Sequence, residues 1–327
     1  SIPTVEAIQL FDDFLCELSK RKVQTFIISG NHDSAERMAF GGRLMKESGV
    51  YVAPVYAGKT QAVVLEDEWG AINIYLLPFV KPANVKRFFE DEQIENYTDA
   101  IRVAVEQMKL NTDERNVLVT HQFVTGAKRS ESEDISVGGT DNVDASVFDE
   151  FDYVALGHIH GPQKIGRETV RYCGTPLKYS FSEIHHKKSV TIVEMKEKGN
   201  VEISTKELAP LRDWCEMKET YMELTEKAYY ENLDQDSYMH ITLTDEEDIP
   251  EAVRKLQVIY PNLMKLDYDN QRTRSNQDIS GAEEVEGKAP LDLFGEFFEL
   301  QNNQPMSEEQ TAFMEELIEK VWEVNER

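Results

Sequence analysis

Hydrophobic and polar positions along the chain follow two spacings, one typical of helices and one typical of strands. Apolar residues recur every three or four positions in three stretches, which predicts amphipathic helices at residues 2–21, 34–47 and 98–110. Short apolar runs lie among these stretches and predict strands at residues 23–29, near Val50, and at 62–65, 72–77, 116–120 and 153–157. Because helices and strands alternate, the pattern favours a layered α/β domain.

Beyond residue 160 the pattern changes to strands without intervening helices. Residues 169–173, 189–195 and 201–208 have the composition and spacing of strands. The turn-forming residues Lys198, Gly199 and Asn200 separate the last two, which predicts a hairpin. We therefore expect the first domain to span residues 1–210.

Three further regions follow this domain. Residues 211–270 combine two strand patterns with one helical pattern, which predicts a small α+β domain. Residues 271–289 are polar and glycine-bearing without periodicity, so we interpret them as a linker. Residues 290–327 contain an apolar cluster and a helix whose first turn is capped by Ser307. Whether this helical tail packs within the chain or binds a partner is left open by the sequence.

The composition is that of a water-soluble globular protein. Of its 327 residues, 40% are hydrophobic and 29% are charged, and no apolar run approaches the length needed to span a membrane. The three cysteines, Cys16, Cys173 and Cys215, lie far apart and form no CxxC pair. This spacing indicates neither a disulfide framework nor a zinc knuckle, and it suits a reducing cytoplasm.

The net charge of −26 argues against broad, nonspecific adhesion to nucleic acid, because phosphate repulsion would dominate at long range. An enzyme of nucleic acids remains compatible with this charge, since a metal cluster and a few basic residues can reverse the local field. Four short basic clusters exist, and each is expected to be a solvated surface group: residues 86–87, 128–129, 185–188, and Arg272 with Arg274.

Polar residues that can bind metals follow three of the predicted strands. Asn31, His32 and Asp33 follow the first, His121 ends another, and His158 and His160 follow the run YVALG. In open α/β sheets, ligands gather at the carboxyl ends of the strands. A carbonyl oxygen with neutral imidazoles suits manganese, iron or zinc better than magnesium. We therefore expect these strand ends to meet at the edge of one sheet and to form a metal site.

Two nearby histidines in a loop are more often surface residues than ligands, so the histidine pair alone would be weak evidence. Three such strand ends in one chain are a much more specific signal for a metal site. The remaining histidines lack such a context. We expect His185 and His186 to lie on the surface, and His240, inside a predicted strand, to be structural.

These motifs resemble those of the calcineurin-like metallophosphoesterases. GNHD stands at residues 30–33, the lone histidine of the family at His121 in THQF, and GHIH at residues 157–160. The stretches THQFVTGA and CGTPLKYSFSE, with the small domain, are similar to a bacterial branch of nuclease subunits that work with an SMC-like ATPase. The resemblance implies a layered β-sandwich flanked by helices, a small capping domain and a helical tail.

The resemblance also implies roles for the site residues. Asn31, His121 and His158 would ligate one divalent metal and His160 the other, with Mn²⁺ the expected ion at both. His32 would stabilise charge on the phosphate or protonate the leaving group, and Asp33 would orient it. The family motifs DxH and GDxxD do not occur before residue 30, so we expect the chain to be truncated at its amino terminus.

The leading hypothesis is a manganese-dependent DNA exonuclease and endonuclease subunit that acts in the cytoplasm on double-stranded ends and hairpins. Residues 290–327 would bind the ATPase, residues 211–270 would help hold DNA, and the resemblance implies a homodimer within a heterotetramer. A second hypothesis keeps the fold but takes small phosphoesters as substrates, which the acidic charge slightly favours. A third, which applies to this truncated chain, is a catalytically impaired scaffold for the ATPase, because the motifs absent before residue 30 would supply half of the metal site.

Overall fold

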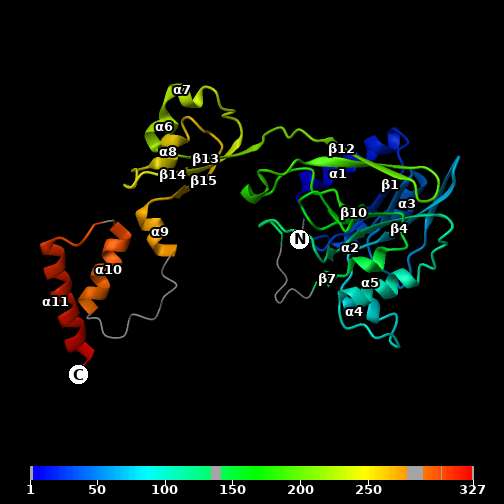
Figure 1. Ribbon diagram of the computed structural model, residues 1–327, viewed down its shortest axis with the longest axis horizontal. Helices are drawn as coiled ribbons and strands as arrows, with labels where there is room; N and C mark the ends of the chain where they lie inside the picture. The colour runs from blue at the N-terminus through cyan, green and yellow to red at the C-terminus, as the bar shows by residue number, and fades with distance from the viewer. Residues whose placement is uncertain (1–2, 134–140, 278–289, 303, 326–327) are drawn as a thin grey trace. The chain divides into compact units, whose positions relative to one another are not determined.

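The computed structural model describes residues 3–133, 141–277, 290–302 and 304–325. The chain divides into two compact units, with the boundary between Pro210 and Leu211. Both units combine sheets with helices, so the α/β class predicted from the sequence is confirmed. Figure 1 labels many of the elements of each unit.

The first unit is built on a six-stranded sheet with the strand order β3-β4-β5-β8-β10-β9. The four inner strands are parallel, whereas β3 and β9 pair antiparallel at the two edges. The strands of this sheet are β3 (Val63–Asp67), β4 (Gly70–Leu77), β5 (Arg115–His121), β8 (Tyr153–Gly157), β9 (Gln163–Ile165) and β10 (Arg167–Tyr172).

The core of the first unit forms where helix α5 (Tyr97–Glu106) packs on the sheet. Asn96 caps this helix, since its side chain accepts a hydrogen bond from the backbone N–H of Asp99 at 2.9 Å. The apolar stripe of α5 is buried with central strand residues such as Leu118 and Val154. Burying this stripe is the main source of stability for a helix of this length.

The first predicted strand does not belong to the six-stranded sheet. Strand β1 (Thr25–Ile28) pairs only with β2 (Val50–Ala53) among the described residues, in a separate parallel pair. The expectation that all three motif-bearing strands share one sheet is therefore wrong in detail. The two sheets are nevertheless joined near the motif, because the backbone N–H of Phe79 donates to the carbonyl of Ser29 at 3.0 Å.

Helices α1 (Val5–Lys20) and α5 agree with the predicted helical stretches. The predicted helix at residues 34–47 is instead split into α2 (Ala35–Met38) and α3 (Gly42–Glu47). Gly41 lies between them with φ of 76°, a left-handed conformation that ends one helix and that glycine adopts at little cost. The short elements that complete the unit are α4 (Pro82–Lys86), β6 (Phe123–Val124), β7 (Asn142–Val143), η1 (Ala145–Phe148) and η2 (Phe181–Glu183).

The predicted hairpin around Gly199 is confirmed as β11 (Ser189–Met195) and β12 (Val201–Glu207). The buried guanidinium of Arg115 ties it to the six-stranded sheet. Arg115 donates to the Met195 carbonyl at 3.2 Å and the Lys196 carbonyl at 2.9 Å, and it also pairs with Asp67. One buried cation thus joins the β3–β4 edge to the hairpin.

The second unit begins with three strands that are all parallel, in the order β13-β14-β15. Its elements are β13 (Trp214–Glu219), α6 (Tyr221–Thr225), α7 (Lys227–Tyr230), β14 (Tyr238–Leu243), α8 (Ala252–Leu256) and β15 (Leu263–Tyr268). Leu224 of α6 and Leu256 of α8 are buried with Met239 and Ile241 of the central strand. The predicted α+β architecture is therefore wrong, because helical crossovers make the sheet parallel.

Helix α9 (Gln271–Gln277) follows β15 directly, where the sequence predicts the start of a linker. This part of the linker prediction is wrong, because Asn270 caps the helix by accepting from the backbone N–H of Thr273 at 3.1 Å. Residues 278–289 lie outside the described residues. Two helices follow, α10 (Pro290–Asn302) and α11 (Glu308–Asn325). None of the described helices combines the length and the apolar character required to cross a bilayer.

Candidate metal centre

The turn after β1 is closed by its own side chains. The Asp33 carboxylate accepts a hydrogen bond from the backbone N–H of Gly30 at 2.7 Å. A side chain at Gly30 would place its Cβ 2.8 Å from the ring of His121, which is closer than real Cβ contacts allow. Glycine at this position therefore lets Asn31 approach the end of β5.

His121 ends β5 and meets Asn31 across the two sheets. The ring Nε2 of His121 lies 2.9 Å from the side-chain oxygen of Asn31. Burial lowers the pKa of His121 to about 3, and the neighbouring imidazoles of His158, His32 and His160 act in the same direction. The ring is therefore neutral at physiological pH, the form in which imidazole binds metals.

His158 lies one residue beyond β8, which pairs with β5 so that His121 is opposite Gly157. Its φ is 112°, an uncommon conformation for a residue with a side chain, and such strain often occurs at functional sites. The rings of His121 and His158 are 5.3 Å apart, edge to face. The Nε2 atom of His158 is buried without a hydrogen-bond partner. Burial is the largest cause that lowers the pKa of this ring, and the positive charge of Arg129 lowers it further.

Arg129 borders this cluster and was expected to be a solvated surface residue. That expectation is wrong. Its guanidinium stacks on the ring of Phe123 at 3.7 Å and pairs with both carboxylate oxygens of Asp141 at 3.0 and 3.1 Å. Phe123 in turn lies 6.2 Å from the ring of His158. The stack and the ion pair hold a cation beside the histidines, where phosphate would be attracted.

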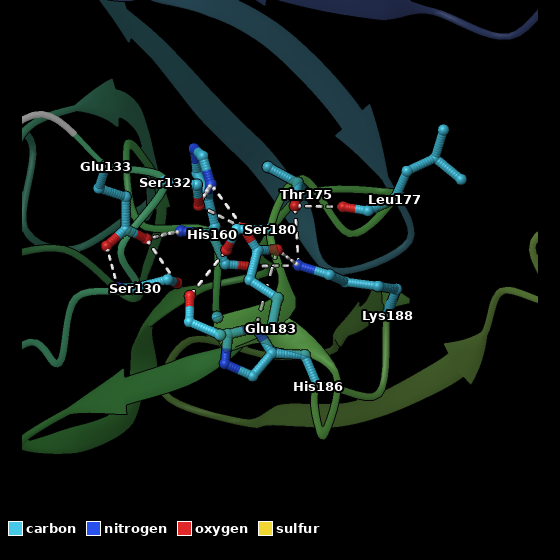
Figure 2. A network of polar contacts seen from close by, with 12 residues as sticks. Ser130, Ser132, Glu133, His160, Thr175, Leu177, Ser180, Glu183, His186 and Lys188 are labelled. Atoms are coloured by element: carbon cyan, nitrogen blue, oxygen red, sulfur yellow. Dashed lines mark hydrogen bonds and ion pairs between the residues drawn. The ribbon is translucent and has the colours of Figure 1, made fainter. Parts of the chain in front are cut away.

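His160 lies in a different network, shown in Figure 2. Its Nδ1 atom lies 2.8 Å from the hydroxyl of Ser132 and 3.1 Å from the carboxylate of Glu183. Its backbone N–H donates to Glu133 at 2.5 Å. These contacts fix both the backbone and the ring of His160.

Glu183 and Lys188 form a buried ion pair behind His160. The Nζ atom of Lys188 lies 2.6 Å from a Glu183 oxygen, and the Glu183 side chain is fully buried. Burial alone would raise the pKa of Glu183, but hydrogen bonds from Lys188, Ser132 and His160 together hold that pKa below its usual range. Lys188, expected to be solvated, is instead 4% exposed, so that expectation is wrong as well.

The other sequence-predicted positions are less enclosed. His32 and Asp33 are exposed, and His32 is close enough to influence the pKa of His121. His185 is exposed as expected, whereas His186 is partly buried near Glu183. His240 lies between two carboxylates in the second unit, in agreement with a structural role.

The residues at the strand ends fit one divalent metal. Two neutral imidazoles and an amide oxygen converge, and the unsatisfied, buried Nε2 of His158 needs a partner of the kind that a metal supplies. Within the described residues, no three side chains among His, Cys, Asp and Glu are grouped closely enough to hold a metal without Asn31. His160 is a single further donor beside this group.

Sequence reasoning missed Ser132, Glu133, Glu183 and Lys188. Glu183 ends the stretch CGTPLKYSFSE, whose resemblance to the nuclease branch implies no role for this residue. No local pattern marks these four residues, because they come from separate parts of the chain: Ser132 and Glu133 share one turn, Glu183 ends η2, and Lys188 directly precedes β11. Their grouping depends on chain pairing that periodicity does not reveal.

The fold and the cluster thus define a mixed α/β protein with a candidate metal site of histidines and an amide at the ends of parallel strands. Comparison with known proteins makes this more specific. The family model described as Type 5 capsule protein repressor C-terminal domain, SbcD_C, matches residues 206–302. The SbcD subunit of the nuclease SbcCD from Staphylococcus epidermidis is 31% identical over 289 residues, which cover 85% of this chain and 75% of that protein. The chain belongs to the SbcD family of nuclease subunits.

Proposed function

We propose that this chain is the nuclease subunit of an SbcCD-like complex and hydrolyses DNA phosphodiesters with two divalent metals, preferably Mn²⁺. Family membership supports the reaction class. The single observation that carries the metal assignment is the convergence of Asn31, His121 and the unsatisfied Nε2 of His158. We further propose that the first unit is the layered metallophosphoesterase fold of that class, and that the protein acts in the cytoplasm.

In this proposal Asn31, His121 and His158 hold one metal, and His160 is a ligand of the second. Bound metals would polarise the phosphodiester and lower the pKa of a water molecule that attacks it. The chain's own residues supply the remaining steps. His32, exposed beside His121, would donate a proton to the departing sugar oxygen. Asp33 would hold the turn that carries His32, because its carboxylate accepts a hydrogen bond from the backbone N–H of Gly30. Arg129 would attract the phosphate.

The second unit would supply contacts to DNA and to the partner ATPase. We propose that residues 211–270 cap the DNA and that α10 and α11 bind an SbcC-like ATPase, within a heterotetramer that contains two copies of this chain. Phe297 and Phe313 support this assignment, because both large apolar side chains are more than half exposed on these helices.

Cleavage assays test the reaction. With Mn²⁺, the full-length protein should degrade a linear duplex and open a DNA hairpin, and EDTA should stop both reactions. Hydrolysis of a small phosphodiester with no cleavage of DNA, alone or with the ATPase, would favour the small-substrate hypothesis instead.

A binding assay tests the tail separately. Phe313→Asp should weaken capture of the ATPase partner, because a charge on an apolar contact surface is costly to bury. Glu309→Gln is the matched control on the same helix and should bind as the unmodified chain does. Equal binding by Phe313→Asp would remove this surface from the proposal.

A further inference from the structure

His160 is held at each of its backbone polar groups by side chains or loops from elsewhere in the first unit. Its N–H donates to the carboxylate of Glu133 at 2.5 Å. Its carbonyl accepts from the ammonium of Lys188 at 3.0 Å and from the backbone N–H of Thr175 at 3.1 Å. The backbone therefore has little freedom to rotate the ring away from the cluster.

The proton on the ring can be located from the donors that surround it. Ser132 Oγ, His160 Nδ1 and a Glu183 oxygen form a triangle of short contacts. The ionised Glu183 can only accept, so the single hydroxyl proton of Ser132 is used in the contact with Glu183. Nδ1 must then carry a proton of its own, which it shares between Ser132 and Glu183. In a neutral imidazole this leaves the lone pair on Nε2.

The ion pair behind Glu183 keeps this arrangement in place. Glu183 has no exposed surface, and Lys188, itself 4% exposed, also donates to Thr175 Oγ1 at 2.9 Å. An ionised carboxylate is tolerated at such a depth because a cation and hydrogen-bond donors surround it. Figure 2 shows the Glu183 side chain among Ser132, His160 and Lys188.

We propose that Glu183, supported by Lys188, is a positioning residue that holds His160 as the Nδ1–H tautomer and so directs the Nε2 lone pair to a divalent cation. The inference rests on the proposed function, in which His160 is a metal ligand. Histidines that bind metals commonly donate their second ring N–H to a carboxylate, which orients the ring and raises its basicity. The structure supplies such a carboxylate for His160, with its own counter-ion.

The first test reads the tautomer without metal. In the full chain, labelled with ¹⁵N-histidine and freed of metal with EDTA, long-range proton–nitrogen spectra distinguish a protonated ring nitrogen from one with a lone pair. His160→Gln identifies the signals of His160 by their loss. The wild-type ring should show a protonated Nδ1 and an unprotonated Nε2. Glu183→Gln should give a mixture of tautomers, because an amide offers both a donor and an acceptor.

The second test measures Mn²⁺ binding by calorimetry. Glu183→Gln should weaken the affinity by about 10- to 100-fold, the usual effect of losing such a supporting residue. Asp152→Asn is the matched control, since Asp152 is also a buried carboxylate paired with a lysine, Lys198, at 2.7 Å. This control lies at the amino-terminal end of β8 and should change neither the tautomer nor the affinity. If Glu183→Gln does not fold, the double variant Glu183→Gln/Lys188→Met removes the unpaired buried charge and takes its place.

The outcomes separate the inference from the function on which it rests. An unchanged His160 tautomer in a folded Glu183 variant overturns the inference. Weaker Mn²⁺ binding by His160→Gln, with wild-type affinity in Glu183→Gln, also overturns it but leaves the proposed function intact. Wild-type Mn²⁺ affinity in His160→Gln removes the metal role of His160, and the inference fails with it.

Discussion

His121 in the first unit and His240 in the second both lie in strands that pair parallel with their neighbours, but the side chains around them differ. His121 meets an amide oxygen and other imidazoles, and its pKa is lowered to about 3. His240 has Glu216 at 2.9 Å from Nδ1 and Asp267 at 2.8 Å from Nε2. Carboxylates occupy both ring nitrogens of His240, whereas the neutral ring of His121 has a lone pair for a metal. The residue type is the same, and the surroundings decide the role.

A similar difference separates two ion pairs of the first unit from two ion pairs of the second. In the first unit Arg115 and Lys188 are almost completely buried, and each makes several hydrogen bonds. In the second unit the pairs of Lys265 with Asp267 and of Arg212 with Asp236 are largely exposed. When a buried pair loses one partner, the remaining charged group is left without a hydrogen-bond partner. When an exposed pair loses one partner, water solvates the remaining group.

The comparison of the histidines predicts the largest effect. His158→Gln should lower Mn²⁺-dependent DNA cleavage by more than about 100-fold, because it removes a proposed metal ligand rather than a supporting residue. His240→Gln is the matched substitution in the second unit and should leave the cleavage rate within about twofold, since its contacts are structural. Rates measured on one duplex at saturating Mn²⁺ check both. Equal losses in the two variants would contradict the distinction.

The comparison of ion pairs predicts the next effect, on stability. Arg115→Met should lower the free energy of unfolding by about 3 kcal/mol, because Asp67 and the Gly70, Met195 and Lys196 carbonyls lose their donor.

Arg212→Met in the second unit is the control and should leave the free energy of unfolding nearly unchanged, since its pair with Asp236 is exposed. Urea unfolding of both variants gives the values. An equal loss of unfolding free energy in Arg212→Met and Arg115→Met would show that burial does not determine what these two ion pairs contribute to stability.

Glycine substitutions compare how tightly the backbone is packed at one position in each unit. Gly157→Ala should destabilise the chain by about 1–3 kcal/mol and weaken Mn²⁺ binding, because the new Cβ would lie 2.8 Å from Nδ1 of His121. Gly295→Ala, in helix α10, meets only Met306 at 3.7 Å and should raise helix stability by up to about 1 kcal/mol. Thermal unfolding with and without Mn²⁺ measures both. Wild-type stability in Gly157→Ala would contradict the close approach to His121.

The smallest effect concerns pH in the second unit. Hydrogen bonds from Arg274 and Lys218 lower the pKa of Asp269 to about 2. Because the folded pKa lies below the ordinary aspartate value, this contribution is complete above about pH 4 and is lost as the pH falls toward about 2. The stability difference between wild type and Asp269→Asn should therefore shrink over that range. A difference that stays constant down to pH 2 would exclude this linkage.

Local patterns in the sequence predicted much of the fold and part of the candidate site. The helix periodicity before residue 21, the hairpin around Gly199 and the strands that end at Leu77, His121 and Gly157 agree with the structure. The role of each metal-binding residue stays a prediction. The split helix at Gly41 and the parallel sheet of the second unit were not predicted, because both depend on how segments pair after they meet.

The sequence by itself determined which residues could do chemistry, since strand composition and the turns after the strands place Asn31, His121 and His158 at strand ends. Only the tertiary structure decided how those side chains are tuned. It buried His121 among imidazoles, left Nε2 of His158 without a partner, and brought Glu183 and Lys188 behind His160. The physical reason is the distance along the chain over which each effect acts. Periodicity and turn chemistry act over a few residues, whereas burial and charge pairing depend on segments that are distant in the chain and adjacent in space.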